Sequence, residues 1–218
     1  VIPARGGSTR LKDKNIYPVA GKPLIRWITE TVVESGCFDK VIISTDSEEI
    51  WSAVSDLPVE RHHRPAEHAT VRATVLKAMM NLMHTMDDKY DVFAYFSPLT
   101  SVEDIRKGMQ LLTEDVDSVV SMVAMPEPIQ KACILQGDWV IPVFDNLTAG
   151  LTNSKFIKKY HTPNGSFYFS WWDKLVENEN FFKGSVKGVL LPPERASDID
   201  DINDIKLAEL AIQNNVGE

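Results

Sequence analysis

The sequence predicts an α/β fold with a mostly parallel sheet and helices on both of its faces. Two observations carry this prediction. Apolar, β-branched runs alternate along the chain with segments whose apolar residues recur at helical spacing. The opening strand, 1–4, leads into a turn at 5–15 that holds a glycine pair, a hydroxyl and four cations, which in an α/β sheet favours polyphosphate binding. With 218 residues, 44% of them hydrophobic, the chain can bury a sizeable core.

The elements follow in order from these patterns. Between Pro23 and Gly36 the apolar spacing is helical, and the run 41–43 begins a second strand, which completes a βαβ unit. Asp46 or Ser47 can cap the next helix, whose first glutamates suit the positive end of its dipole. The remaining expected elements are a helix over 74–86, a strand at 92–96, a helix over 102–113, a strand at 118–123, an aromatic strand at 165–169, a strand at 186–191 and a helix from 202 to about 213.

The segment 126–163, called the arm below, interrupts the alternation. It carries scattered prolines and a Gly-Asp-Trp turn at 137–139, and it shows no clean helical or strand period. A long irregular segment inside a compact domain is usually functional. We therefore expect residues 1–218 to form a single domain into which the arm is inserted, and we expect the arm to reach a second subunit.

Composition excludes several classes of protein. The net charge of −8 argues against nucleic acid as a partner, because an acidic protein is repelled by a phosphate backbone. No apolar run approaches the ~20 residues of a membrane span, so we expect no membrane partner. The two cysteines, Cys37 and Cys133, lie far apart and in no metal-binding spacing, which is typical of a reduced compartment. The expected location is the cytoplasm.

The opening turn is the first candidate site. Arg5 and Lys14 are suited to cradle phosphates, and the backbone of Gly6 and Gly7 can approach an anion closely because no side chain obstructs it. The alternative is a solvated basic turn. The position directly after the first strand favours the phosphate interpretation.

A second candidate site lies near the C-terminus. Asp198 and Asp200 alternate around Ile199, so in an extended segment both carboxylates point the same way and can share one hard divalent cation. The alternative is capping of the last helix, which the acidic run at 200–204 also suits. The two roles are compatible.

Three weaker candidates have structural alternatives. The polar cluster 44–46 can contact a base or ribose, or cap the next helix. The run 61–65 can place a guanidinium on a nucleobase or phosphate, but its adjacent histidines point different ways in an extended chain. The aromatic run 163–169, with Phe181 and Phe182 beyond it, is more often core than ligand cage.

Taken together, these motifs resemble one family. The stretches that carry the resemblance occur in a compatible order and spacing: 2–8 (IPARGGS), 14–16 (KNI), 21–25 (GKPLI), 44–50 (STDSEEI), 64–67 (RPAE), 164–169 (NGSFYF) and 198–200 (DID). The chain resembles the acylneuraminate cytidylyltransferases, that is, CMP-sialic acid synthetases and close relatives. The resemblance covers nearly the whole chain.

The resemblance implies a Rossmann-like fold of the nucleotide-diphospho-sugar transferase type. It implies transfer of CMP from CTP to the anomeric hydroxyl of a nine-carbon, or eight-carbon, 2-keto sugar acid, with release of pyrophosphate. It further implies a homodimer joined through the arm. The implied nucleotide-binding residues are Ala4, Arg5, Gly6, Gly7, Ser8, Lys14, Arg64 and Asn164, and the implied sugar-binding residues are Ser97, Tyr168, Phe181 and Phe182.

The resemblance also implies Mg²⁺ on Asp198 and Asp200. Such a reaction mainly needs its nucleophile positioned and its growing charge neutralised. We therefore expect Arg5, Lys14 and Asp200 to be the catalytic residues. Asp200 would order a water that accepts the proton of the sugar hydroxyl, with a metal-bound hydroxide as the alternative acceptor.

The chain departs from the family pattern mainly on the sugar side. Thr9 replaces a lysine in the opening turn, and 94–100 (AYFSPLT) replaces a Gln-Pro-Thr-Ser-Pro-Leu-Arg motif. Ser154 and Lys155 replace an Arg-Gln pair, and 68–72 lacks an expected acidic residue. Such losses indicate either an enzyme for a different keto-acid sugar or a nucleotide-binding paralogue without turnover. The clustered carboxylates favour the enzyme over the paralogue. A metal-dependent glycosyltransferase is a weaker alternative, because its Asp-x-Asp pair would lie in mid-chain and the pair here lies near the C-terminus. A purely structural protein is the weakest, because nothing would then select the turn of glycines and cations.

Overall fold

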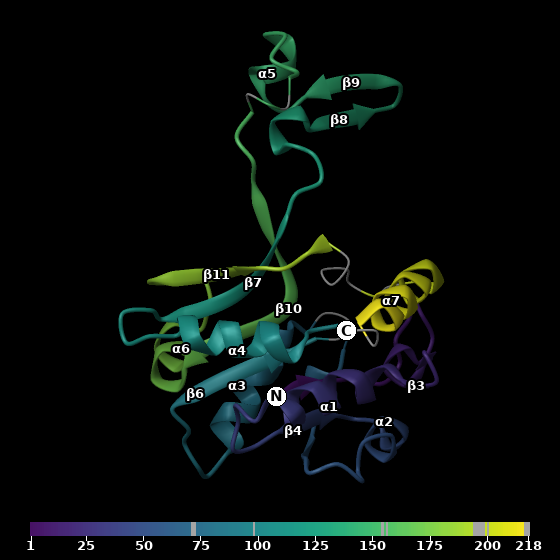
Figure 1. The fold of residues 1–218 in the computed structure, drawn as a ribbon, viewed down its shortest axis with the longest axis vertical. Coiled ribbons are helices and arrows are strands. Elements are labelled where there is room, and N and C mark those ends of the chain that lie inside the picture. The colour runs from purple at the N-terminus through teal and green to yellow at the C-terminus, as the bar shows by residue number, and fades with distance from the viewer. Residues whose placement is uncertain are drawn as a thin grey trace.

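The computed structural model describes residues 1–70, 73–97, 99–153, 155, 157–193, 199 and 201–215, without the side chains of 211 and 213–215. Within these residues a central sheet lies between helices, and the arm projects from the body (Figure 1). No helix in this part of the chain is long and apolar enough to cross a membrane.

Seven strands form the central sheet. One set has the order β1-β4-β5 and the other β11-β7-β10-β6. The amide of Phe96 donates to the carbonyl of Val1 over 3.1 Å, which joins the two sets at β1 and β6. Of these seven strands, β10 alone runs antiparallel to its neighbours, so the predicted mostly parallel sheet is confirmed. Their bounds are β1 Ile2–Pro3, β4 Ile42–Thr45, β5 Glu60–His63, β6 Val92–Phe96, β7 Ser118–Ala124, β10 His161–Trp171 and β11 Val186–Leu190.

Helices cover both faces of this sheet, as predicted. Helices α1 and α4 pack on one face, where their apolar residues join the stacked rings of Phe167 and Phe169. Helices α3 and α6 pack on the other, around Met79, Phe93 and Trp172. The helix bounds are α1 Leu24–Ser35, α2 Glu48–Ser52, α3 Val75–Thr85, α4 Val102–Leu111, α6 Trp172–Asn178 and α7 Ile202–Asn215, with short 3-10 turns η1 Lys14–Ile16 and η2 Ala66–His68.

Three helices, α2, α3 and α4, begin where the sequence places a capping side chain. The Ser47 hydroxyl accepts from the amide of Ile50, and the Thr74 hydroxyl accepts from the amide of Lys77. Ser101 and Asp104 form a reciprocal capping box at the start of α4. Each satisfies an amide that has no partner within its helix. Local sequence therefore determines these boundaries.

The arm contains regular structure, although its sequence shows no clean helical or strand period. Strands β8 (Cys133–Gln136) and β9 (Trp139–Pro142) form an antiparallel hairpin around the predicted turn. Turn η3 (Ile129–Lys131) precedes this hairpin, and α5 (Asp145–Thr148) follows it. Almost every residue of the hairpin is exposed, so the alternation of apolar and polar residues that marks a half-buried strand is missing.

A third apolar cluster holds the C-terminal helix to the body. Val19 and Leu24, from the hairpin of β2 (Pro18–Val19) and β3 (Lys22–Pro23) and from the start of α1, pack with Ile199, Ile205 and Ala208. The amide of Ala20 also donates to Glu209 over 3.1 Å. The cluster brings Ile199 against the β2–β3 hairpin.

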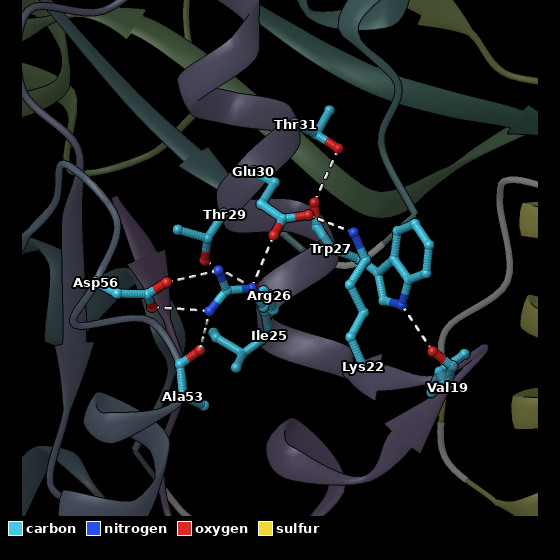
Figure 2. Close-up of polar contacts among 10 residues, drawn as sticks. All are labelled: Val19, Lys22, Ile25, Arg26, Trp27, Thr29, Glu30, Thr31, Ala53 and Asp56. Carbon is cyan, nitrogen blue, oxygen red and sulfur yellow. Dashed lines mark hydrogen bonds and ion pairs between the residues drawn. The ribbon is translucent and has the colours of Figure 1, made fainter. Parts of the chain in front are cut away.

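Polar contacts fix this hairpin on α1 (Figure 2). The Trp27 indole donates to the carbonyl of Val19 over 2.9 Å, and the Lys22 ammonium lies over the Trp27 ring and pairs with Glu30. Arg26 contacts Glu30 and holds Asp56 with both terminal nitrogens. The ion pairs themselves are partly exposed and add little stability, but they anchor the hairpin against which α7 rests.

Candidate active site

A cavity of about 300 Å³ opens at the carboxyl ends of the parallel strands. Two of its polar residues follow a strand directly, Arg64 after β5 and Ser97 after β6, and Arg5 follows β1 with Ala4 between them. Ser8 and Lys14 line the same cavity from the opening turn. Open α/β sheets bind ligands at this edge. The structure thus brings together five of the side chains predicted from sequence.

Arg64 is the most buried charged group of this cavity, with 5% of its surface exposed. Its Nε donates to Ser44 Oγ over 3.2 Å, and its Nη2 donates to the carbonyl of Ser44 over 2.9 Å. His62 Nδ1 lies 3.0 Å from the same Ser44 Oγ. Burial lowers the pKa of Arg64, yet a guanidinium stays charged in proteins. Arg64 therefore presents a fixed positive charge.

The opening turn is held by side chains from its surroundings. The Gly6 amide donates to Asp46 Oδ1 over 2.7 Å, and Asn15 Nδ2 donates to the carbonyl of Arg5 over 3.0 Å. Gly7 has a positive φ of 61°, which favours glycine. Gly6 and Gly7 line a neighbouring cavity of about 420 Å³, beside the acidic residues Asp13, Asp46, Glu48 and Glu49. Arg5 lines both cavities.

Four predicted nucleotide-binding residues do not line the main cavity: Gly6 and Gly7, which line the neighbouring cavity, and Ala4 and Asn164. Ala4 is buried in the core, where its amide continues the β1–β4 pairing by donating to the carbonyl of Ser44. Asn164 donates through Nδ2 to Ser166 Oγ over 2.6 Å, and its buried Oδ1 has no hydrogen-bond partner among the described residues. Asn164 lines neither the main cavity nor the apolar one described below.

Lys14 connects the opening turn to the C-terminal segment. Its Nζ donates to the carbonyl of Ile199 over 2.5 Å, and the Ile199 side chain is buried in the third cluster. Asp198 and Asp200 themselves lie outside the described residues. Within the described part of the chain, no three His, Cys, Asp or Glu side chains are grouped so that they could hold a metal ion.

An apolar cavity, also of about 300 Å³, adjoins the first. The centroid of the Tyr168 ring lies 5.4 Å from that of the Tyr95 ring, 5.1 Å from that of Phe181 and 6.0 Å from that of Phe182. Burial raises the pKa of Tyr168. Three predicted sugar-binding residues, Tyr168, Phe181 and Phe182, therefore share this cavity, whereas the fourth, Ser97, lines the first.

Sequence reasoning missed some of the lining residues. Thr74, Val75 and Ala78, at the start of α3, line the main cavity, as does Tyr95 of β6. The Thr74 cap gave a usable signal, because a helix that follows a parallel strand begins at the ligand-binding edge. Tyr95 carries no comparable signal in the sequence.

Comparison with known proteins identifies related sequences. A family model described as Cytidylyltransferase matches residues 1–133. Over 99% of its length the chain is 27% identical to the pseudaminic acid cytidylyltransferase of Campylobacter jejuni, of which it covers 96%. It is 30% identical to the CMP-N,N'-diacetyllegionaminic acid synthase of Legionella pneumophila, again over 99% of the chain and 96% of the relative. The N-acylneuraminate cytidylyltransferase of Escherichia coli is 30% identical, with half of its length covered.

Solved structures show the same fold. A CMP:2-keto-3-deoxy-manno-octonic acid synthetase complexed with CTP superposes with a TM-score of 0.69 at 17% identity, over 98% of this chain and 97% of that one. A 4-diphosphocytidyl-2C-methyl-D-erythritol synthase from Anaerococcus prevotii gives a TM-score of 0.63 at 15% identity, over 97% and 98%. The predicted Rossmann-like α/β architecture is confirmed by these neighbours.

Proposed function

The chain belongs to the cytidylyltransferase family, and we propose that it transfers CMP from CTP to the anomeric hydroxyl of a sialic-acid-like 2-keto-3-deoxy sugar acid and releases pyrophosphate. The observation that carries this proposal is the convergence of Arg5, Lys14 and Arg64 on one cavity at the carboxyl edge of the sheet. Arg10 lines the same cavity, and four cations in one cavity of a protein with a net charge of −8 suit an anionic ligand such as CTP.

In this proposal the nucleotide is held mainly by electrostatics. Arg5 and Lys14 neutralise the charge that builds on the α-phosphate and on the leaving pyrophosphate. Arg64, held by Ser44, lies toward the cytosine, as the family resemblance implies. The anomeric oxygen attacks the α-phosphorus, the bond between the α-phosphorus and the bridging oxygen breaks, and pyrophosphate departs.

The same proposal assigns Mg²⁺ to Asp198 and Asp200. The residue between them is Ile199, whose carbonyl oxygen lies 2.5 Å from Lys14 Nζ. Lys14 in turn lines the main cavity. Carboxylates beside phosphate oxygens are the donors that a hard divalent cation prefers, and such a cation stabilises charge on the transferring phosphoryl group. Asp200 accepts the proton of the anomeric hydroxyl through an ordered water.

On the sugar side, Ser97, Tyr168, Phe181 and Phe182 contact the sugar acid. Asn164 lies in a turn that we place facing both CTP and the sugar acid. Because CTP is supplied inside the cell, we propose that the protein acts in the cytoplasm.

We also propose that the protein is a homodimer formed through the arm. The arm projects from the body (Figure 1) and exposes large apolar side chains, among them Trp139 at 79%, Leu135 at 72% and Val140 at 62%. Large apolar side chains exposed together on one small element favour an interaction site. Residues 1–218 are then a single catalytic domain with 126–163 as an inserted dimerisation arm.

The test is pyrophosphate release from CTP and Mg²⁺ in the presence of N-acetylneuraminic, legionaminic, pseudaminic, 3-deoxy-octulosonic or 8-amino-octulosonic acid. Release that requires one of these sugars supports the proposal. Silence with every sugar would contradict it.

A paired substitution tests the site. Lys14→Ala removes a cation that lines the nucleotide cavity, so we expect kcat/KM for CTP to fall by about 100-fold, since one transition-state donor contributes about that much. Lys12→Ala removes an exposed cation from the same turn that does not line the cavity, and we expect it to leave kcat/KM unchanged. Equal effects of the two substitutions would argue against the assigned site.

A further inference from the structure

We propose that Asp46 is a positioning residue for nucleotide binding, which holds the backbone of the opening turn so that the Arg5 side chain enters the main cavity. The inference rests on the proposed function, in which Arg5 binds the phosphates of CTP, and adds a residue that acts on CTP only through Arg5. It is carried by the hydrogen bonds on either side of Arg5 and by the location of Asp46 in the neighbouring cavity.

The peptide group between Arg5 and Gly6 is held at both of its polar atoms. Its N–H, on Gly6, donates to Asp46 Oδ1 over 2.7 Å. Its carbonyl oxygen, on Arg5, accepts from Asn15 Nδ2 over 3.0 Å. Because a peptide group is planar, hydrogen bonds at these two atoms oppose rotation of the whole group. Asp46 and Asn15 therefore fix the backbone that follows the Arg5 Cα atom.

The backbone that precedes Arg5 is held by the sheet. The amide of Ala4 donates to the carbonyl of Ser44 over 2.9 Å, and Asp46 directly follows the same strand, β4. Ser44 also accepts two hydrogen bonds from Arg64. The carboxyl end of β4 thus sets the positions of two cations of the main cavity, Arg5 and Arg64.

Asp46 acts from outside the main cavity. It lines the neighbouring cavity together with Gly6, and it does not line the main one. A Cβ on Gly6 would lie 3.3 Å from Ser47 Cβ and 3.6 Å from Asp46 Oδ1, so the turn packs closely on this part of the chain. The side chain that caps α2 is Ser47, so capping of that helix does not account for the Asp46 carboxylate.

Asp46 has two opposite effects on CTP binding. Its hydrogen bond to Gly6 favours binding, because an Arg5 side chain that is already in place loses less conformational freedom when CTP binds. Its negative charge disfavours binding, because it repels the phosphates. The test must therefore change the hydrogen bond without changing the charge.

The variants Asp46→Asn and Asp46→Ala form such a matched pair. Both lack the negative charge, but only asparagine retains an oxygen that can accept from the Gly6 amide. Isothermal titration calorimetry measures the Kd of each variant for CTP. We expect Asp46→Ala to bind CTP about 10-fold more weakly than Asp46→Asn, since one hydrogen bond contributes about that much. Calorimetry reports stoichiometry separately, so a partial loss of folded protein leaves Kd unchanged.

A double-mutant cycle tests whether Asp46 acts through Arg5. In an Arg5→Ala background there is no guanidinium to position, so the Kd values of Asp46→Asn and Asp46→Ala should become equal. Asp88→Ala is the control, because it removes an exposed carboxylate that lines neither the main nor the neighbouring cavity. We expect this control to leave the Kd for CTP unchanged.

The possible failures are distinguishable. Suppose that the wild-type protein releases pyrophosphate but Asp46→Asn and Asp46→Ala bind CTP equally, or that their difference persists without the Arg5 side chain. The inference is then overturned and the proposed function stands. If the expected Kd values are found but no sugar supports pyrophosphate release, the proposed function is overturned and the positioning role of Asp46 stands. A wild-type protein that does not bind CTP overturns both.

Discussion

At the scale of single residues, the position of the buried Arg64 guanidinium depends on its hydrogen bonds to Ser44. Ser44 Oγ contacts both Arg64 Nε and His62 Nδ1, and Ser44 is itself fully buried. In the proposed site Ser44 is therefore a positioning residue for the guanidinium, because it contacts Arg64 and does not line the cavity. The Ser44 hydroxyl orients the Arg64 guanidinium toward the main cavity but does not line that cavity itself.

We predict that Ser44→Ala raises the KM for CTP with a smaller change in kcat. The substitution removes one acceptor from a buried cation, for which the cost is about 1–3 kcal/mol. Steady-state kinetics and thermal unfolding measure the two effects. Ser52→Ala, on an exposed position of α2, is the control. If Ser44→Ala lowered stability without moving the KM for CTP, Ser44 would be merely structural.

His62 makes stability depend on pH. Burial, with a smaller contribution from Arg64, lowers the pKa of His62 below its ordinary value of 6.5. As pH falls through 6.5 the unfolded chain takes up a proton before the folded chain does. The contribution of the neutral His62 ring to the free energy of unfolding is therefore present above pH 6.5 and is lost as pH falls toward the folded-state pKa.

We predict that His62→Gln reduces the slope of unfolding free energy against pH between pH 5 and 6.5. Urea unfolding at a series of pH values measures this slope, and NMR titration of the His62 ring measures its pKa directly. A His62 ring that titrates at or above 6.5 would contradict the prediction.

At the scale of elements, the packing of α4 on β10 depends on a glycine. A Cβ on Gly108 would come within 2.5 Å of Phe169 Cε2 and 3.0 Å of Phe167 Cε2. Those two rings stack with centroids 4.7 Å apart and are fully buried, so they have little room to move. The glycine brings the helix close to the sheet at the expense of helix propensity.

We predict that Gly108→Ala destabilises the protein by about 1–3 kcal/mol through overpacking, although alanine favours helices by about 1 kcal/mol. Lys107→Ala, on an exposed position of the same helix, should leave stability nearly unchanged. Chemical denaturation of both variants gives the comparison. A stabilised Gly108→Ala protein would show that α4 shifts at no cost.

At the scale of the whole molecule, the arm extends beyond the body of the protein, which contains the packed core. The strand β10 begins in the arm and ends in the central sheet, so the arm and the body share one continuous element. Strand β10 thus links the arm to Tyr168, which lies on the same strand and lines the apolar cavity.

We predict that the wild-type protein is the proposed dimer and that the double substitution Leu135→Ser and Trp139→Ser makes it a monomer, because it removes exposed apolar groups from the proposed interface. Analytical ultracentrifugation at micromolar concentration measures the state. Asp138→Ser, in the turn between the same strands, is the control. A wild-type protein that sediments as a monomer would rule out the dimer.

Much of this fold was predictable because its signals are local. Capping by Ser47, Thr74 and Ser101 marks helix starts, and apolar spacing marks the buried faces, so elements such as β6 were predicted within a residue. The arm hairpin was missed because its exposed strands carry no burial pattern. For the site, the position of Arg5 shortly after the first strand followed from the order of elements. Arg64 follows β5, a strand without an apolar pattern in the sequence, and Lys14 begins the 3-10 turn η1, so neither position was predicted in this way.

The sequence by itself determined the α/β alternation, the basic turn after the first strand and the family to which the chain belongs. Only the tertiary structure decided that β10 enters the sheet antiparallel, that Ser44 supports Arg64, and that Tyr95 lies between the two cavities. The physical reason is range: caps and periodicity act over a few residues, whereas strand direction and cavity walls arise from contacts between residues tens of positions apart.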